Sequence, residues 1–276
     1  MPKIDAHHHF WRYDPVEYGW IDDAMRVIQR DFLPADLKTT IDSAGVEGVV
    51  SVQARQTVEE TRWLLDLATR FDFIRGVVGW APLIDPAVAD VLAQMAQNPK
   101  LRSIRHVLQG ERDPLYMLRD DFNRGIRALK PLGLGYDILI FERHLPQTIE
   151  FVDRHPDQVF IVDHLAKPRV REREFSPWRE NLRELASRPN VYCKISGLAT
   201  EGDYTRWTPE QLLPYIETVL EAFTPNRTMF GSDWPVCLVA IEYVRWAELV
   251  ETAIQDFSPC ERERIWSGTA IEAYRL

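Results

Sequence analysis

Short runs rich in β-branched and aromatic residues alternate with longer amphipathic runs along the whole chain. The short runs have the length and the bounding turn residues of strands, whereas the longer runs repeat apolar residues at helical spacing. The pattern predicts eight strands, at residues 3–10, 46–53, 74–80, 101–107, 134–141, 158–163, 190–195 and 227–232. A helical pattern follows each of them.

Local signals mark where the first two helices begin and end. Pro34 suits the initial turn of a helix that Ala44-Gly45 closes, and Thr57 with Glu60 resembles a capping box. The apolar stripe of the second helix comprises Leu64, Leu65, Leu67 and Ala68. Further helices are expected at 86–97, 120–131, 144–155, 177–188, 208–223, 239–256 and 260–273.

Eight strand–helix units are the number in a closed parallel barrel, and the sequence contains no linker or low-complexity tract that would divide the chain. We therefore expect an α/β fold, a (β/α)8 TIM barrel that forms a single domain over residues 1–276. The structural alternative is an open, doubly wound sheet. That fold requires a glycine-rich turn after the first strand, where this chain has histidines and a tryptophan.

Composition narrows the classes of partner. Of the 276 residues, 45% are hydrophobic and 27% are charged, as in ordinary soluble proteins, and the net charge of −9 argues against nucleic acid. Cys193, Cys237 and Cys260 have no close spacing, which indicates free thiols in a reducing compartment. The sequence shows no signal peptide and no run of membrane-spanning length, so we expect a cytoplasmic protein without a membrane partner.

The first strand carries three successive histidines. Because side chains alternate along a strand, His7 and His9 lie on one face and His8 on the other. Two converging imidazoles offer a divalent metal two nitrogen ligands, and they lie at the carboxyl end of a strand, where barrels place functional residues. The alternative, a remnant of a purification tag, fits poorly because the run is short and continues a strand-like stretch.

Polar residues also end the second and fourth strands. Gln53 can bind a hydroxylated ligand, although a solvated loop glutamine explains it equally well. Arg105 and His106 point to opposite faces, so one enters the barrel mouth and the other packs outside. The sequence does not decide between them.

The fifth, sixth and seventh strands each contribute an ionisable group. Asp137 interrupts an apolar run, where a carboxylate requires a cation or hydrogen-bond donors, and a structural partner is favoured over a ligand. His164 and Lys167 follow the sixth strand as candidates for the pocket. Lys194 can contact an anionic group or extend along the barrel rim.

The eighth strand ends in Gly231-Ser232-Asp233-Trp234-Pro235. The glycine permits close backbone approach, and the proline stops the strand. Since the eighth strand of a closed barrel lies beside the first, Asp233 is expected near His7 and His9. There it can serve as a metal ligand, as a general base for water, or as both.

As a set, these motifs resemble the amidohydrolase superfamily of the amidohydrolase-2 type, in the branch of lactonases that act on sugar lactones with little dependence on metal. The likeness rests on Asp-Ala-His-His-His-Phe-Trp at 5–11, Val-Gln-Ala at 52–54, Arg-His at 105–106, Asp-His-Leu-Ala-Lys-Pro at 163–168, Lys-Ile-Ser-Gly-Leu at 194–198, Gly-Ser-Asp-Trp-Pro-Val at 231–236 and Ala-Ile-Glu-Ala-Tyr at 270–274. Each motif alone is weak, but together they span the chain. The resemblance implies a distorted eight-stranded barrel and hydrolysis of an aldono-1,4- or 1,5-lactone, such as fucono-, rhamnono- or galactonolactone.

Carried over by position, the resemblance implies His7, His9 and Asp233 as metal ligands, with His164 as a further ligand and, together with Asp233, as a catalytic residue. Metal-rich relatives place a histidine after the fifth strand, where this chain has Tyr136-Asp137. That departure argues against a binuclear centre. Zinc or another divalent cation is therefore expected to be weakly bound or dispensable.

The hypothesis for the reaction is that Asp233 takes a proton from water, which attacks the lactone carbonyl. A bound cation, protonated His164 or Arg105 would stabilise the resulting oxyanion. The residues expected to hold the hydroxyls and the apolar ring face are Trp11, Gln53, Arg105, His106, Lys194 and Trp234.

Three other functions compete with this hypothesis. The cations Arg55, Arg105, Lys167 and Lys194 would suit a lactone derived from a dicarboxylate or an aromatic compound. A decarboxylase would need tightly bound metal, and a catalytically silent sugar-binding barrel would bind a lactone without releasing acid. Each function implies a small-molecule partner, and the sequence leaves the oligomeric state, a homo-oligomer included, open.

Overall fold

Eight parallel strands form one sheet in the order β1 to β8 in the computed structural model, which describes residues 2–276. The strands are β1 (Lys3–His8), β2 (Val46–Val52), β3 (Ile74–Gly79), β4 (Leu101–His106), β5 (Gly135–Ile138), β6 (Phe160–Val162), β7 (Val191–Ile195) and β8 (Thr228–Phe230). Each strand pairs in parallel with the next one along the chain. The expected (β/α)8 barrel is confirmed.

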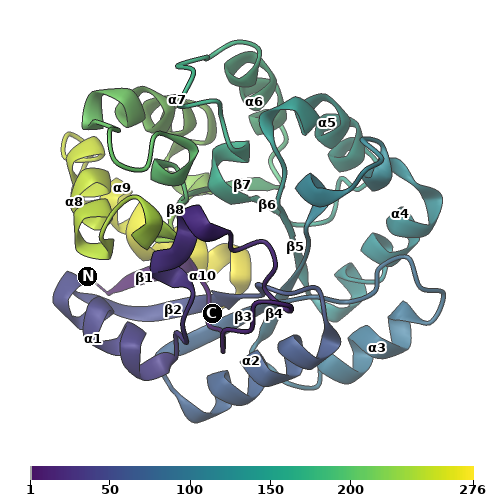
Figure 1. Cartoon of the computed structure of the whole chain (residues 1–276). Coiled ribbons are helices and arrows are strands. Elements are labelled where there is room, and N and C mark those ends of the chain that lie inside the picture. Colours follow the sequence, from purple (N-terminus) through teal and green to yellow (C-terminus); the bar gives the residue numbers. More distant parts are fainter. Residues whose placement is uncertain (1) are drawn as a thin grey trace.

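Helices surround this sheet on its outer side (Figure 1). They are α1 (Pro34–Ala44), α2 (Val58–Arg70), α3 (Val88–Met95), α4 (Asp120–Arg127), α5 (Leu145–Asp153), α6 (Trp178–Ala186), α7 (Pro209–Arg227), α8 (Tyr243–Ala253), α9 (Pro259–Glu263) and α10 (Thr269–Tyr274). A single helix was expected at 260–273, but a π-helical turn at Arg264–Gly268 separates α9 from α10. No helix among residues 2–276 is both long enough and apolar enough to cross a membrane.

The predicted signals at the first helices hold in part. Pro34 occupies the first turn of α1, and Gly45 ends it at a φ of 67°. The Thr57 hydroxyl accepts a hydrogen bond from the Glu60 amide at 3.1 Å. The Glu60 carboxylate, however, turns to the amides of Ala54 and Arg55 in the β2–α2 loop, so the capping box is only half formed.

The barrel closes through backbone contacts just beyond β8. The Asp233 amide donates to the His7 carbonyl at 2.8 Å, and the His9 amide donates to the Trp234 carbonyl at 2.7 Å. A buried Asp5 carboxylate accepts from both the amide and the hydroxyl of Ser232. The first strand is thereby tied to the residues that follow the eighth, as expected from the barrel topology.

Two apolar layers stabilise the barrel. One lies between the sheet and the helices, and the other fills the barrel itself against the C-terminal helix α10. The inner layer comprises Ile4, Ala6, Val50, Val52, Val78, Ile161, Met229, Ala270, Ala273 and Tyr274. The polar side chains at the opposite, carboxyl ends of the strands therefore rest on a packed floor.

Candidate active site

The first strand delivers His7 and His9 to the barrel mouth and His8 to the outside, as the alternation predicts. The imidazole of His8 packs between β1 and β2, with Nε2 2.8 Å from the Ser51 hydroxyl. The Nε2 atoms of His7 and His9 lie 3.2 Å apart. Gly231 lets the backbone that follows β8 pack closely against His7, since a Cβ at Gly231 would lie 2.8 Å from the Cβ of His7.

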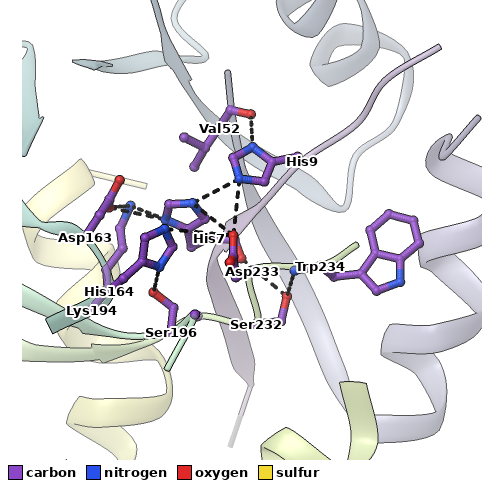
Figure 2. Close-up of polar contacts among 12 residues, drawn as sticks. His7, His9, Val52, Asp163, His164, Lys194, Ser196, Ser232, Asp233 and Trp234 are labelled. Atoms are coloured by element: carbon purple, nitrogen blue, oxygen red, sulfur yellow. Dashed lines mark hydrogen bonds and ion pairs between the residues drawn. The ribbon is translucent and has the colours of Figure 1, made fainter. Parts of the chain in front are cut away.

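Asp233 faces three imidazoles at once. Its Oδ1 lies 3.3 Å from Nε2 of His9, 3.7 Å from Nε2 of His7 and 3.9 Å from Nε2 of His164. Figure 2 shows this convergence. Burial raises the pKa of Asp233, but the adjacent imidazoles of His164 and His9 outweigh burial and hold that pKa below its ordinary value. Asp233 is therefore a carboxylate at neutral pH, as a general base must be.

A left-handed turn presents His164. Four successive residues, 164–167, have φ between 48° and 57°. Nδ1 of His164 lies 2.9 Å from the Ser196 hydroxyl, and a Cβ on the next residue, Gly197, would lie 2.5 Å from that nitrogen. Burial lowers the pKa of His164 to about 4, so its imidazole is neutral at pH 7 rather than protonated as hypothesised.

The cluster has the chemistry of a metal site. Ligand atoms of His7, His164 and Asp233 all lie within 4.8 Å of one another, and His9 Nε2 is closer still to the first and the last. Ligands of a tetrahedral zinc are about 3.3 Å apart, close to the observed separations. The His9 Nδ1–H donates to the Val52 carbonyl at 2.8 Å, which leaves Nε2 a lone pair.

The outer nitrogen of His7 rests on a buried carboxylate. His7 Nδ1 lies 3.2 Å from Asp163 Oδ1, and burial lowers the pKa of His7 well below its usual value. A neutral imidazole that donates through Nδ1 presents an Nε2 lone pair toward Asp233. Arg105 Nη1 lies 3.4 Å from that Nε2, so a cation and the guanidinium would compete for it. His7, His164 and Asp233 thus lie close enough together to hold a single divalent ion, and His9 adjoins two of them.

Beneath His7, the structure assembles a buried group of two carboxylates and two cations. Lys194 Nζ lies 2.6 Å from Asp137 and 2.9 Å from Asp163, and Arg105 Nη1 lies 2.9 Å from Asp163. Asp137 also accepts hydrogen bonds from Ser103 at 2.6 Å and Tyr274 at 2.6 Å. Asp137 thus has the structural partners that the sequence favoured.

Three residues expected to contact substrate lie elsewhere. Lys194 is fully buried in the group below His7, because two carboxylates there require a counter-charge. Gln53 accepts from Arg105 at 3.0 Å and supports that guanidinium from behind. His106 points outward, stacked on Tyr116 with ring centroids 5.1 Å apart. Arg105 is therefore the member of its pair that reaches the cavity.

Trp11 and Trp234 also differ from the expectation that they cover a sugar ring. Trp11 is fully buried, and its indole N–H donates to the Arg30 carbonyl at 2.8 Å. Trp234 packs on Phe32, with centroids 5.1 Å apart, and its indole points away from the histidine cluster (Figure 2). Both tryptophans therefore pack around Phe32 and do not line the cavity.

A cavity of about 570 Å³ opens above the cluster. His9, Arg105, His164 and Asp233 line it with Glu17, Trp20, Met25, Ala54, Arg55, Gln56, Thr57, Val107, Gln109, Leu139, Lys167, Thr200, Glu201, Tyr204 and Val236. Glu17, Trp20 and Met25, which were not expected at the site, belong to the connection between β1 and α1. The length of this connection could have indicated that it contributes to the site, since most βα loops have only about 2–6 residues.

Comparison with known proteins identifies the family. Residues 4–276 match the amidohydrolase family. The L-fucono-1,5-lactonase of Burkholderia multivorans is 42% identical, and that of Burkholderia ambifaria is 36% identical, each over 99% of this chain and 96% of the relative. A crystal structure of an amidohydrolase from Burkholderia multivorans with bound zinc covers 100% of both chains at 40% identity and a TM-score of 0.96. The chain belongs to the amidohydrolase family.

Proposed function

We propose that this chain is a lactonase that hydrolyses a sugar lactone to its aldonic acid, with L-fucono-1,5-lactone as the first candidate substrate. The main observation behind the proposal is the convergence of one ionised carboxylate, Asp233, with three imidazoles, of which His9 and His164 line the cavity together with Asp233. Two full-length relatives named for this reaction, at 42% and 36% identity, supply the substrate class.

In the proposed reaction, Asp233 accepts a proton from water as the water oxygen bonds to the lactone carbonyl carbon. The electron pair of the carbonyl moves to its oxygen, and Arg105, which lines the cavity, stabilises that negative charge. The tetrahedral intermediate then expels the ring oxygen, which takes the proton from Asp233. The products are a hydroxyl group and a carboxylic acid, so atoms and charge balance.

Ser196 gives His164 two useful protonation patterns. A hydroxyl can accept a proton from Nδ1 or donate one to it, and the two groups are 2.9 Å apart. The imidazole can therefore present either a lone pair or an N–H at Nε2, toward Asp233. The first pattern suits metal binding, and the second suits hydrogen bonding to the reacting oxygen.

We propose that His7, His9 and Asp233, joined by His164, hold a divalent cation, with zinc as the first candidate because a relative of 40% identity binds it. When bound, such an ion polarises the lactone carbonyl and lowers the pKa of water. Asp163 would orient His7, and the Val52 carbonyl would orient His9.

The charges around the cavity favour a neutral sugar lactone over a dicarboxylate-derived one. The four cations that could bind paired carboxylates are already matched by the chain's own acids. Arg55 pairs with Glu17, Lys167 pairs with Glu201 at 3.4 Å, and Arg105 and Lys194 pair with Asp163. Hydroxyl groups, in contrast, can be bound by the Arg55–Glu17 and Lys167–Glu201 pairs and by Gln56 and Gln109, all of which line the cavity, without displacing an ion pair.

A pH-indicator screen of aldonolactones, with and without a chelator, tests the function. We expect acid release from L-fucono-1,5-lactone to exceed that from dicarboxylate-derived lactones. Replacing Asp233 with Asn should lower kcat/KM by roughly 10²–10⁴-fold, the usual range for removal of a general base. Asp157→Asn, at a side chain that is 76% exposed, is the matched control.

The zinc content of Asp233→Asn separates the two roles of the carboxylate. Full zinc occupancy with lost activity would assign Asp233 as the base, whereas parallel loss of both would make it chiefly a ligand. Activity near that of the parent in Asp233→Asn would refute the mechanism. Saturable lactone binding without acid release by the parent would leave a sugar-binding barrel instead.

A further inference from the structure

One tryptophan that lines the cavity is not explained by the chemistry of the histidine cluster. Trp20 is 44% exposed, although large aromatic side chains are usually well buried. It shares the cavity wall with His9, His164 and Asp233. An aromatic surface that faces both solvent and a reactive cluster is the kind of position at which a ligand is bound.

Other aromatic rings fix the position of Trp20. Trp20 packs edge-on against Trp11, with ring centroids 5.8 Å apart and planes at 89°. Trp11 is itself buried, hydrogen-bonded through its indole N–H, and packed on Phe32 at 5.6 Å. The sequence predicted that Trp11 would contact the substrate ring. In the structure, the tryptophan that lines the cavity is Trp20, which packs on Trp11.

The residues just before Trp20 are tied to the loop between β2 and α2. Glu17 forms an ion pair with Arg55, whose guanidinium lies 5.4 Å from the ring centre of Tyr18. The Tyr18 hydroxyl donates to the buried Glu60 carboxylate at 3.3 Å. These contacts hold the early part of the β1–α1 connection, dark purple in Figure 1, across the barrel mouth. These contacts therefore fix the position of Trp20 before any substrate binds.

A sugar lactone presents two surfaces, a ring face of C–H groups and an edge of hydroxyl groups. The cavity has complementary parts, because Trp20 and Met25 supply apolar surface and Gln56, Gln109 and Glu201 supply polar groups. Burial of C–H groups against an indole is favourable and orients the ring, while hydrogen bonds at the edge select its hydroxyl pattern.

We infer that Trp20 is the platform on which the C–H face of the sugar-lactone ring stacks, and that it determines substrate affinity. The inference rests on the proposed function and extends it to a residue outside the catalytic cluster. Stacking is made equally in the bound substrate and in the transition state. Its removal should therefore raise KM while leaving kcat nearly unchanged.

The test compares Trp20→Ala, Trp20→Leu and Trp20→Phe with the parent. A matched control is Trp63→Ala, at a half-buried tryptophan on α2. Steady-state kinetics with L-fucono-1,5-lactone are paired with calorimetric binding of its lactam, whose ring nitrogen resists hydrolysis. We expect Trp20→Ala and Trp20→Leu to raise KM and the lactam Kd by about 10-fold, with kcat within about 3-fold of the parent. Trp20→Phe and Trp63→Ala should stay within about 3-fold in every parameter.

The leucine variant keeps apolar bulk, so it carries the test if the alanine variant does not fold. Equal lactam affinity in the parent and Trp20→Leu would overturn the platform, as would a loss confined to kcat. If the parent binds the lactam but opens no lactone, the hydrolase function fails while the affinity ratio still decides the platform. A parent that binds no lactam overturns both.

Discussion

Lys194 shows how a single buried residue can organise the site without touching the cavity. Its ammonium contacts Asp137 at 2.6 Å and Asp163 at 2.9 Å, and all three side chains are fully buried. Burial raises the pKa of Asp137, whereas Lys194 and His7 outweigh burial at Asp163 and hold that pKa well below its usual range. The ammonium therefore helps to keep Asp163, the carboxylate beside His7, ionised.

Replacing Lys194 with Met should destabilise the protein by about 3–5 kcal/mol, because it leaves a buried charge without its partner. Adding Asp137→Asn removes that charge and leaves Asp163 paired with Arg105. The double variant should therefore be more stable than Lys194→Met alone. Urea unfolding of the parent, the two single variants and the double variant measures the coupling. Additive losses would contradict an electrostatic role for Lys194.

The positions of some side chains at the site could be predicted from the sequence, and those of others could not. Strand alternation placed His7 and His9 together and His8 apart, because a period of two residues is a local property. Strand alternation could not show whether Arg105 or His106 faces the cavity, since that depends on which face of β4 is turned inward. The burial of Lys194 could not be predicted either, because its two acidic partners lie 57 and 31 residues away in the chain.

At the scale of elements, the site is built by backbone that leaves the strands. Asp233 has a φ of 59°, and residues 164–167 form a left-handed turn directly after β6. Predicted strands at 158–163 and 227–232 shorten to β6 (Phe160–Val162) and β8 (Thr228–Phe230). An apolar pattern reports which residues are buried but not where the ladder of hydrogen bonds ends, so the predicted strands extend past β6 and β8 up to the functional turns.

Gly197 is the element-scale position that these turns depend on most. Its φ is 61°, and a Cβ would lie 2.5 Å from His164 Nδ1 and 3.1 Å from Asp233 Oδ2. Gly197→Ala should therefore lower kcat/KM by roughly 10²-fold, since small displacements of catalytic groups are that costly. It should also lose about 1–2 kcal/mol of stability to backbone strain.

Gly45→Ala is the matched control for Gly197→Ala. Gly45 has a similar φ of 67°, but a Cβ there would have no atom within 4 Å among residues 2–276. It should show a comparable strain cost with full activity. Denaturant unfolding and kcat/KM, measured for both variants, separate strain from displacement. Full activity in Gly197→Ala would show that the His164 turn can shift without loss of function.

At the scale of the whole molecule, the protein is a closed barrel with a long connection, residues 9–33, attached over its mouth. The barrel was predictable because eight repeats of strand and helix leave few other topologies. The connection was not, since its short 3-10 helix at Asp23–Ile28 lacks a sustained apolar period. Glu60 on α2 joins the two parts, because it accepts hydrogen bonds from Tyr18 in the connection and from the β2–α2 loop.

The contribution of Glu60 to the stability of this attachment depends on pH. Burial raises the pKa of Glu60 from 4.5 to about 7, against the opposing effect of the Arg55 and Ala54 amides. Between these pH values the folded protein binds a proton that the unfolded chain has released, so stability contributed by Glu60 falls as pH rises from about 4.5 to 7. The total change is about 3 kcal/mol.

Glu60→Gln isolates this contribution, because the amide mimics the protonated carboxyl and does not titrate. The free energy of unfolding of the parent minus that of Glu60→Gln should decline between pH 4.5 and 7 and level off above that range. Urea unfolding of both proteins from pH 4 to 8 gives the difference, in which the contributions of all other groups cancel. A difference that rises with pH would mean that the amide donors and Arg55 outweigh burial. The connection that holds Trp20 would then be anchored by an ion at every pH at which the enzyme works.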